Sequence, residues 1–216
     1  MYFINRIQPY HLDILKEVGN IGAGHAATAL SKLLNKTIDM KVPAVRVVSF
    51  EEITELVGGS DNVVAAIFLR IEGEAPGNMF FMLPVNEATN LIRYLTGDQQ
   101  FDLNSPPFQE LGLSALQEVG NILAGSYLSA FSDLTKLNLQ PSVPALSVDM
   151  AIAILSYGLL ELSQVGDYAI VIETEILEKV DVYSQKTSGH FFLLPDPDSY
   201  EIIFRALGVS IDDGSC

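Results

Sequence analysis

Hydrophobic residues recur at every third or fourth position in two long stretches of the chain, residues 13–34 and residues 114–135. On a helix drawn at about 100° per residue, the apolar positions of each stretch cluster on one side, and polar residues and glycines occupy the other side. Both stretches are therefore predicted to be helices that pack one side on a core. The apolar positions are Leu15, Val18, Gly22, Ala26, Ala29 and Leu33 in the first, and Leu116, Val119, Leu123, Tyr127, Ala130 and Leu134 in the second.

The two predicted helices are copies of one sequence. The first reads DILKEVGNIGAGHAATALSKLL and the second reads SALQEVGNILAGSYLSAFSDLT. Two copies at so long a period indicate an internally duplicated domain and not a solenoid. The polar and glycine identities that the copies share keep one offset of 101 positions, and they include Glu17 and Glu118, Asn20 and Asn121, and Gly24 and Gly125.

The segments that follow each predicted helix indicate strands. In the first half, residues 37–48 alternate as a strand does, with Pro43 at an edge or a bulge, and residues 63–71 and 78–83 are predicted to form a hairpin. In the second half, Val143-Pro144 repeats Val42-Pro43 at the same offset of 101. Residues 168–176 and 190–194 are predicted to form the second hairpin, because FFLLP at 191–195 matches FFMLP at 80–84.

These elements predict an α/β (α+β) fold. We expect a duplicated pseudo-twofold unit, in which a six-stranded, largely antiparallel sheet is packed by two long helices that carry the repeated residues. Residues 1–97 would form the first repeat, residues 98–109 a polar, proline-containing linker, and residues 110–216 the second repeat of one compact domain. Shorter helices are expected at residues 50–57, 85–95 and 199–207.

Composition limits the classes of partner. Of the 216 residues, 49% are hydrophobic and 18% are charged, which is typical of a globular protein. The net charge of −15 argues against nucleic acid and anionic membrane surfaces, because both attract basic proteins. The single cysteine, Cys216, provides neither a disulfide framework nor a cysteine-based metal site. The N-terminus lacks the apolar core of a signal peptide, and the longest apolar run is too polar for membrane insertion, so we expect a cytoplasmic protein.

One short pattern suggests a nucleotide site and is better explained by packing. Gly22-Ala-Gly24-His-Ala-Ala27 fits the dinucleotide pattern G-x-G-x-x-A. That pattern binds a pyrophosphate only where a buried strand turns into the start of a helix. Here the preceding residues are charged and helix-periodic, and the second copy has Leu123 in place of Gly22. The three histidines are scattered, and no nucleophile motif is present, so metal and covalent chemistry are not indicated.

What remains is a carboxylate and a carboxamide, one turn apart on a solvent-facing helix, in two copies. This pair alone forms no covalent intermediate, but it suits an active site completed by another protein. A carboxamide both donates and accepts hydrogen bonds, so it can hold a water molecule in line with a phosphorus atom. A glutamate beside it can pair with a lysine of the partner, and the glycine one turn further on leaves room for another backbone.

The repeated pattern resembles the phosphatase motif of the CheC family of bacterial chemotaxis proteins. The resemblance rests on D-x-x-x-E-x-x-N at 13–20, S-x-x-x-E-x-x-N at 114–121 and the Val-Pro strand after each helix, and it covers essentially the whole chain. Members of the family dephosphorylate the response regulator CheY and bind the receptor deamidase CheD. The resemblance implies that Asn20 and Asn121 position the attacking water and that Glu17 and Glu118 contact the regulator. It also implies that the chain has no cofactor of its own, because the acyl phosphate and Mg²⁺ belong to CheY.

Two interpretations of function stay open at this stage. The chain is either a phosphatase that acts on CheY phosphate, or a scaffold without catalysis that binds CheD or the flagellar switch. A second question concerns the apolar residues after the second Val-Pro strand, which replace acidic residues of the first half. They form either a deeper core or a docking patch for CheD, and the candidate patch residues are Asp149, Met150, Ile152 and Ile154.

Overall fold

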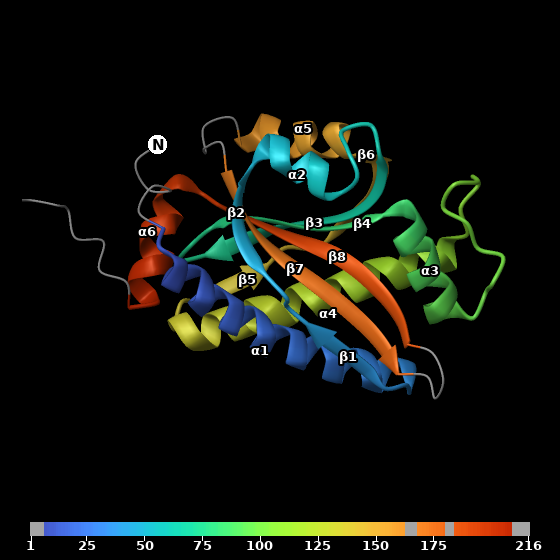
Figure 1. Cartoon of the computed structure of the whole chain (residues 1–216), viewed down its shortest axis with the longest axis horizontal. Coiled ribbons are helices and arrows are strands. Elements are labelled where there is room, and N and C mark those ends of the chain that lie inside the picture. Colours follow the sequence, from blue (N-terminus) through green and yellow to red (C-terminus); the bar gives the residue numbers. More distant parts are fainter. Residues whose placement is uncertain (1–6, 163–167, 180–183, 209–216) are drawn as a thin grey trace, which may run out of the picture.

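The computed structural model describes residues 7–162, 168–179 and 184–208 (Figure 1). The predicted long helices, both hairpins and the shorter helices are all present within these residues. In chain order the elements are α1 (Pro9–Leu34), β1 (Ile38–Lys41), β2 (Val45–Ser49), α2 (Phe50–Leu56), β3 (Val63–Gly73), β4 (Gly77–Pro84), α3 (Val85–Thr96), α4 (Glu110–Thr135), β5 (Leu139–Pro141), β6 (Ala145–Met150), α5 (Ala151–Leu162), β7 (Tyr168–Lys179), β8 (Ser184–Pro195) and α6 (Pro197–Ala206).

The strands form one antiparallel sheet in the order β1-β7-β8-β4-β3-β5, with β2 also paired to β7 and β6 also paired to β3. The two hairpins, β3–β4 and β7–β8, lie side by side in the middle through the pairing of β4 with β8. Each outer segment pairs with the hairpin of the other half, because β1 and β2 flank β7 and β5 and β6 flank β3. Neither half therefore completes its sheet alone. The predicted α+β fold with an antiparallel sheet is confirmed.

The strand count differs from the prediction because each Val-Pro strand is divided in two. Pro43 lies between β1 and β2, and Pro144 lies between β5 and β6. Proline has no N–H to donate to a ladder, so pairing stops there and resumes on the same neighbouring strand. Six predicted strands thus become eight segments.

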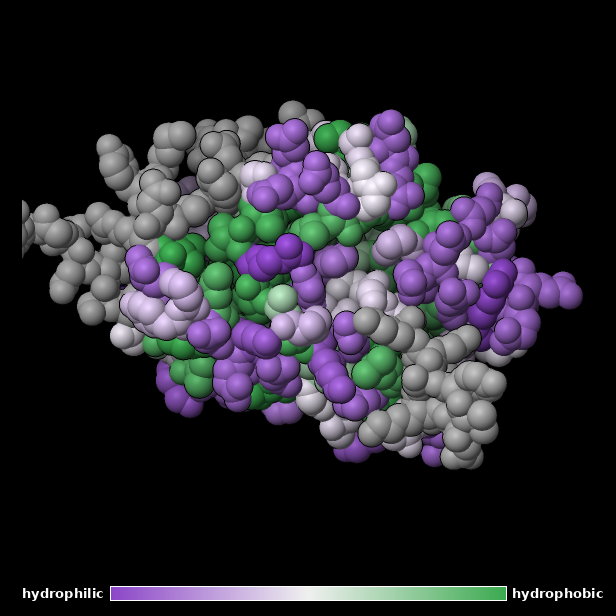
Figure 2. Space-filling model, in the orientation of Figure 1, coloured by the Kyte–Doolittle hydropathy of each residue, from purple (hydrophilic) through white to green (hydrophobic). Residues whose placement is uncertain are grey.

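Helices cover both faces of the sheet (Figure 1). The long helices α1 and α4 lie beside each other on one face, where α3 and α6 complete the layer, and this face buries the larger core. The shorter helices α2 and α5 cover the other face over a smaller core. Figure 2 shows apolar surface along the sheet between α2 and α1, with hydrophilic side chains gathered over α2 and α3.

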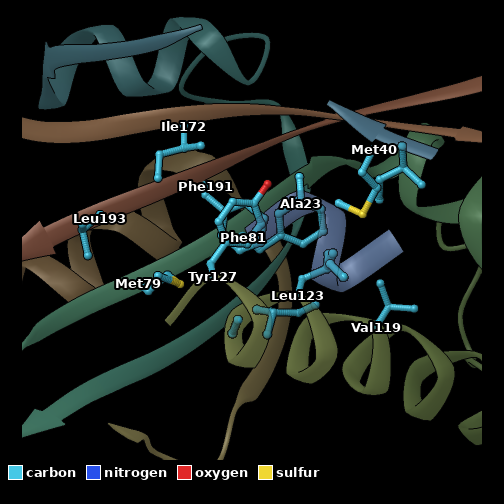
Figure 3. Close-up of a cluster of buried hydrophobic side chains, with 14 of the residues drawn as sticks. Ala23, Met40, Met79, Phe81, Val119, Leu123, Tyr127, Ile172, Phe191 and Leu193 are labelled. Atoms are coloured by element: carbon cyan, nitrogen blue, oxygen red, sulfur yellow. The ribbon is translucent and has the colours of Figure 1, made fainter. Parts of the chain in front are cut away.

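Aromatic side chains mark the centre of the larger core (Figure 3). Phe81 on β4 and Phe191 on β8 are cross-strand neighbours, and their rings stack with centroids 4.6 Å apart. Tyr127 of α4 packs on Phe191, also at 4.6 Å, and its hydroxyl makes a 3.0 Å hydrogen bond with Thr174. Burial raises the pKa of Tyr127 to about 12, so this hydroxyl stays neutral and its role is the hydrogen bond inside the core.

The sequence match between the hairpins is out of register with the structure. Matching FFMLP to FFLLP aligns Phe80 with Phe191, yet Phe80 faces the smaller core and Phe191 faces the larger one. A shift of one residue along a strand transfers every side chain to the opposite face. The helix after β4 is capped by Pro84 itself, whereas the helix after β8 is capped by Asp196, one residue beyond Pro195. The matched pentapeptides are therefore similar sequences that occupy non-equivalent positions.

The long helices approach each other closely at Gly22. A Cβ atom built on Gly22 would lie 3.0 Å from the Cα atom of Tyr127 on α4, closer than normal van der Waals contact. The contact is with backbone, which cannot swing aside as the end of a side chain can. The glycine that suggested a dinucleotide pattern is thus a packing residue at a helix crossing.

We predict that Gly22→Val lowers the free energy of unfolding by about 1–3 kcal/mol, the usual effect of overpacking a core. The matched control is Gly24→Val, where the added Cβ meets no described heavy atom within 4 Å. Denaturant unfolding of both variants measures the difference. Equal stabilities would contradict the close crossing.

Candidate functional site

The repeated carboxylate and carboxamide residues lie on the exposed sides of α1 and α4. Glu17 and Asn20 are exposed near the middle of α1, and Glu118 and Asn121 are exposed at the equivalent place on α4. Residues three apart on a helix are neighbours, so each Glu–Asn pair projects together from one face. The predicted exposure of these four residues is confirmed. Their chemical roles stay predictions.

The two residues inside each pair explain why that face is turned outward. In E-V-G-N, the valines Val18 and Val119 are buried, and so are the glycines that follow them. A Cβ on Gly19 would lie 3.3 Å from both methyl groups of Val42, and a Cβ on Gly120 would collide with Ile67 of β3. The V-G side of each helix is therefore held tightly against the sheet, and the E and N side faces solvent.

The side chain of Asn20 is tied to the segment that follows its helix. Its Oδ1 accepts a hydrogen bond of 3.3 Å from the backbone N–H of Val42, directly before Pro43. On the other helix a different residue makes the equivalent link, because Gln117 Nε2 donates to the carbonyl of Pro144 at 2.8 Å. The described residues offer no hydrogen-bond partner to the side chains of Glu17, Glu118 or Asn121.

The two copies of the site are consequently not equivalent. Val42 is 2% exposed and its side chain lies against Gly19, whereas its counterpart Val143 is 87% exposed. Asn20 has one acceptor position occupied and a fixed orientation, and Asn121 has both free within the described structure. Sequence reasoning missed this difference, because it depends on a contact between residues 22 positions apart. The only sequence feature that pointed to this contact was the Val-Pro pair repeated after each helix.

The alternative chemistries considered from the sequence have no counterpart in the geometry. Gly22 and Gly24 lie inside α1, which begins at Pro9, so the G-x-G-x-x-A pattern does not form a helix start that would bind phosphate. His11, His25 and His190 lie on α1 and β8, and burial lowers the pKa of His11 and of His190. Among the described residues, no three His, Cys, Asp or Glu side chains gather as metal ligands do.

The described helices also include none with the length and apolar character needed to span a membrane. That the chain has no cofactor of its own, and that it is cytoplasmic, stay predictions.

The candidate docking patch at the start of α5 is partly exposed. Asp149 is exposed and its carboxylate accepts the N–H of Met150 at 2.7 Å, while Met150 and Ile152 are each 42% exposed. Ile154 is only 8% exposed, because α5 turns this side chain with Ala151 and Leu155 into the smaller core. The inclusion of Ile154 in a surface patch was therefore wrong.

An open groove of about 580 Å³ runs between α2 and α5 on this face. It has an acidic wall and an apolar wall, so it is amphipathic. Its lining residues are Glu51, Thr54, Glu55, Gly59, Ser60, Ile152 and Leu155.

Comparison with known proteins bears on the two helical sites. The model of the CheC-like family matches residues 11–47 and 111–148. The CheY-P phosphatase CheC of Bacillus subtilis (strain 168) is 51% identical over 211 residues, which are 98% of this chain and 100% of that protein. The chain belongs to the CheC-like family. Each stretch of the CheC-like match contains one Glu–Asn pair together with most of the divided strand that follows it.

Two further relatives place this CheC-like chain near the flagellar switch proteins in sequence and fold. The flagellar motor switch phosphatase FliY of Bacillus subtilis (strain 168) is 30% identical over 132 residues, which are 61% of this chain and 34% of FliY. The crystal structure of Thermotoga maritima FliY superposes with a TM-score of 0.74 at 18% identity, covering 94% of this chain and 98% of that one. The second likeness shows a shared fold.

The inequality of the two sites predicts a difference in stability between Asn20→Ala and Asn121→Ala. Both substitutions replace an exposed helical asparagine, so their effects on helix propensity cancel in the comparison. Only Asn20→Ala leaves the N–H of buried Val42 without its partner, which should make it less stable by about 1 kcal/mol. Denaturant unfolding of the two variants checks the difference. Equal free energies of unfolding would show that the Val42 bond contributes nothing.

Proposed function

We propose that this chain is a phosphatase that hydrolyses the aspartyl phosphate of the response regulator CheY. The observation that carries the proposal is the 51% identity to a CheY-P phosphatase over the full length of both proteins. The exposed Glu–Asn pairs on α1 and α4 support it, because they provide the chemistry that such a reaction needs from a partner.

Hydrolysis of an acyl phosphate needs a water molecule placed in line with the bond that breaks. The carboxamides of Asn20 and Asn121 would hold that water, since an amide oxygen accepts from the water and an amide N–H₂ donates to a phosphoryl oxygen. The electrophile, its leaving carboxylate and the Mg²⁺ that neutralises the phosphoryl charge belong to CheY. The contribution of this chain is therefore positioning, which lowers the barrier without a covalent intermediate.

Glu17 and Glu118 would fix the register of CheY on each helix. Both carboxylates are exposed, and the described residues give them no hydrogen-bond partner, so they are available to a cation of the regulator. A lysine near the phosphoryl group would bring CheY and the carboxamide together at a defined distance. The two helices would then act as two independent sites.

We expect Asn20→Ala and Asn121→Ala each to remove one site, and the double variant to be nearly inactive while still folded. Losing a group that positions a reacting water raises a barrier by several kcal/mol, on the order of a hundredfold in rate or more. The measurement is the loss of phosphate from CheY, with CheY alone as the baseline. A matched control is Lys32→Ala with Asp133→Ala, exposed positions of the same two helices outside the repeated motif.

Two outcomes of that assay would contradict the proposal. A double variant that melts far below the wild type would make the asparagines structural. A wild-type chain that does not accelerate phosphate loss would leave a scaffold for CheD or the flagellar switch as the remaining function.

CheD is proposed as a second partner, at the surface of Asp149, Met150 and Ile152. The support is an exposed carboxylate beside two partly exposed apolar side chains, next to the amphipathic groove between α2 and α5. An apolar patch with a charged rim is the usual composition of a docking surface. This face lies on the opposite side of the sheet from α1 and α4, so both partners could bind together.

Asp149→Lys is predicted to weaken CheD binding tenfold or more, about 1.4 kcal/mol, while phosphatase activity survives. The matched control is Asp133→Lys, the same charge change at an exposed position of α4. Titration of each purified variant with CheD checks the prediction. An unchanged affinity of Asp149→Lys would place the CheD site elsewhere.

A further inference from the structure

Six glycines lie inside the two long helices, and four of them have a reason within the fold. A Cβ on Gly19, Gly22, Gly112 or Gly120 would meet a neighbouring atom at 3.3 Å or less. Those four allow the helices to approach the sheet, each other and the loop that holds Phe101. Gly24 and Gly125 are different, because a Cβ at either position meets no described heavy atom within 4 Å.

The fold therefore leaves Gly24 and Gly125 unexplained. Glycine is, after proline, the least favourable residue in a helix interior, and both positions lie well inside their helices. Neither has a positive φ angle, so no left-handed backbone requires glycine there. The loss of helix stability that a glycine causes nevertheless occurs twice, at equivalent positions of the two copies.

Their place on the helix relates them to the proposed active sites. Gly24 follows Asn20 by four residues, and Gly125 follows Asn121 by four, so each glycine lies one turn beyond its carboxamide on the same face. Asparagine has a short side chain. Its amide reaches a phosphoryl group on another protein only if the backbone of the helix comes close to that protein. A Cβ one turn away would stand in the path of such an approach.

We propose that Gly24 and Gly125 are positioning residues, which give the backbone of the phosphorylated regulator clearance to reach each carboxamide. The inference rests on the proposed phosphatase function. Adding one methyl group would hold the regulator away from the helix and move the water out of line. Displacements of about 1 Å are enough to reduce a positioned reaction by about a hundredfold. The open space beside Gly24 and Gly125 in the free chain would thus be filled by the regulator in the complex.

The test uses chains in which a single site operates. Gly24→Ala is made in the Asn121→Ala chain, and Gly125→Ala is made in the Asn20→Ala chain. The matched controls are Lys32→Ala and Asp133→Ala, which are exposed and equivalent positions on the same two helices. Three quantities are measured: the melting temperature, kcat and KM for CheY phosphate, and the affinity for CheY activated with beryllofluoride and Mg²⁺.

Each glycine variant should be more stable than its parent and less active. Alanine favours the helix, so the melting temperature should rise by about 2–4 °C, which shows that the fold is intact. The value of kcat/KM should fall tenfold or more, and the affinity for activated CheY should weaken, while the controls change neither. A variant that is more stable, equally active and equally well bound would overturn the proposal.

The binding arm separates this inference from the proposed function. If the parent chains bind activated CheY without accelerating its dephosphorylation, the phosphatase proposal fails. The role of the glycines is then tested by binding alone. Weaker binding of Gly24→Ala and Gly125→Ala would support it, and unchanged binding would contradict it.

Discussion

The constraint on which both sites depend is the close packing of α1 and α4 against the sheet. Within each E-V-G-N sequence, the valine and glycine are buried. A Cβ at Gly120 would collide with Ile67, and a Cβ at Gly19 would lie 3.3 Å from Val42, which is tighter than ordinary contact. Because the helix cannot rotate without losing that contact, the glutamate and asparagine on its other side have a fixed direction. Pre-organisation of the helix backbone reduces the entropy lost on binding, and the hydrogen bond to Val42 restrains the carboxamide of Asn20 further. The same four residues thus specify packing and present chemistry.

The shared sheet makes the two sites one structural unit. Each divided strand pairs with the hairpin of the opposite half, so the segment beside one helix is held by strands from the other half. The Val42 N–H that orients Asn20 belongs to such a segment, since β2 continues from it onto β7. Duplication has therefore produced two sites with one origin but different surroundings. Asn20 is tethered, and Asn121 has an exposed valine at the equivalent place.

The sequence was sufficient for the features that depend on local periodicity. The exposed Glu–Asn faces follow from the 3.6-residue repeat. The division of each Val-Pro strand was not predicted, although its cause is local, because proline has no N–H to donate. The pairing of β1 and β2 with β7 could not be predicted, because it joins residues 119 to 140 positions apart, from Ser49 with Tyr168 to Ile38 with Glu178. The match of FFMLP with FFLLP was misleading, since similarity of apolar letters does not reveal which face a strand turns inward. Ile154 was misplaced for a related reason, because an apolar helix does not show which of its sides is buried.

The central claim is that a carboxamide on the surface of this chain positions water in the active site of another protein. A crystal structure of the chain bound to CheY, with Mg²⁺ and beryllofluoride in place of the phosphoryl group, tests it most directly. We predict that CheY lies across the exposed face of α1 or α4, with the Asn20 or Asn121 side-chain oxygen within about 3 Å of a water in line with the beryllium. A complex in which CheY lies elsewhere, with both asparagines still facing solvent, would contradict the account.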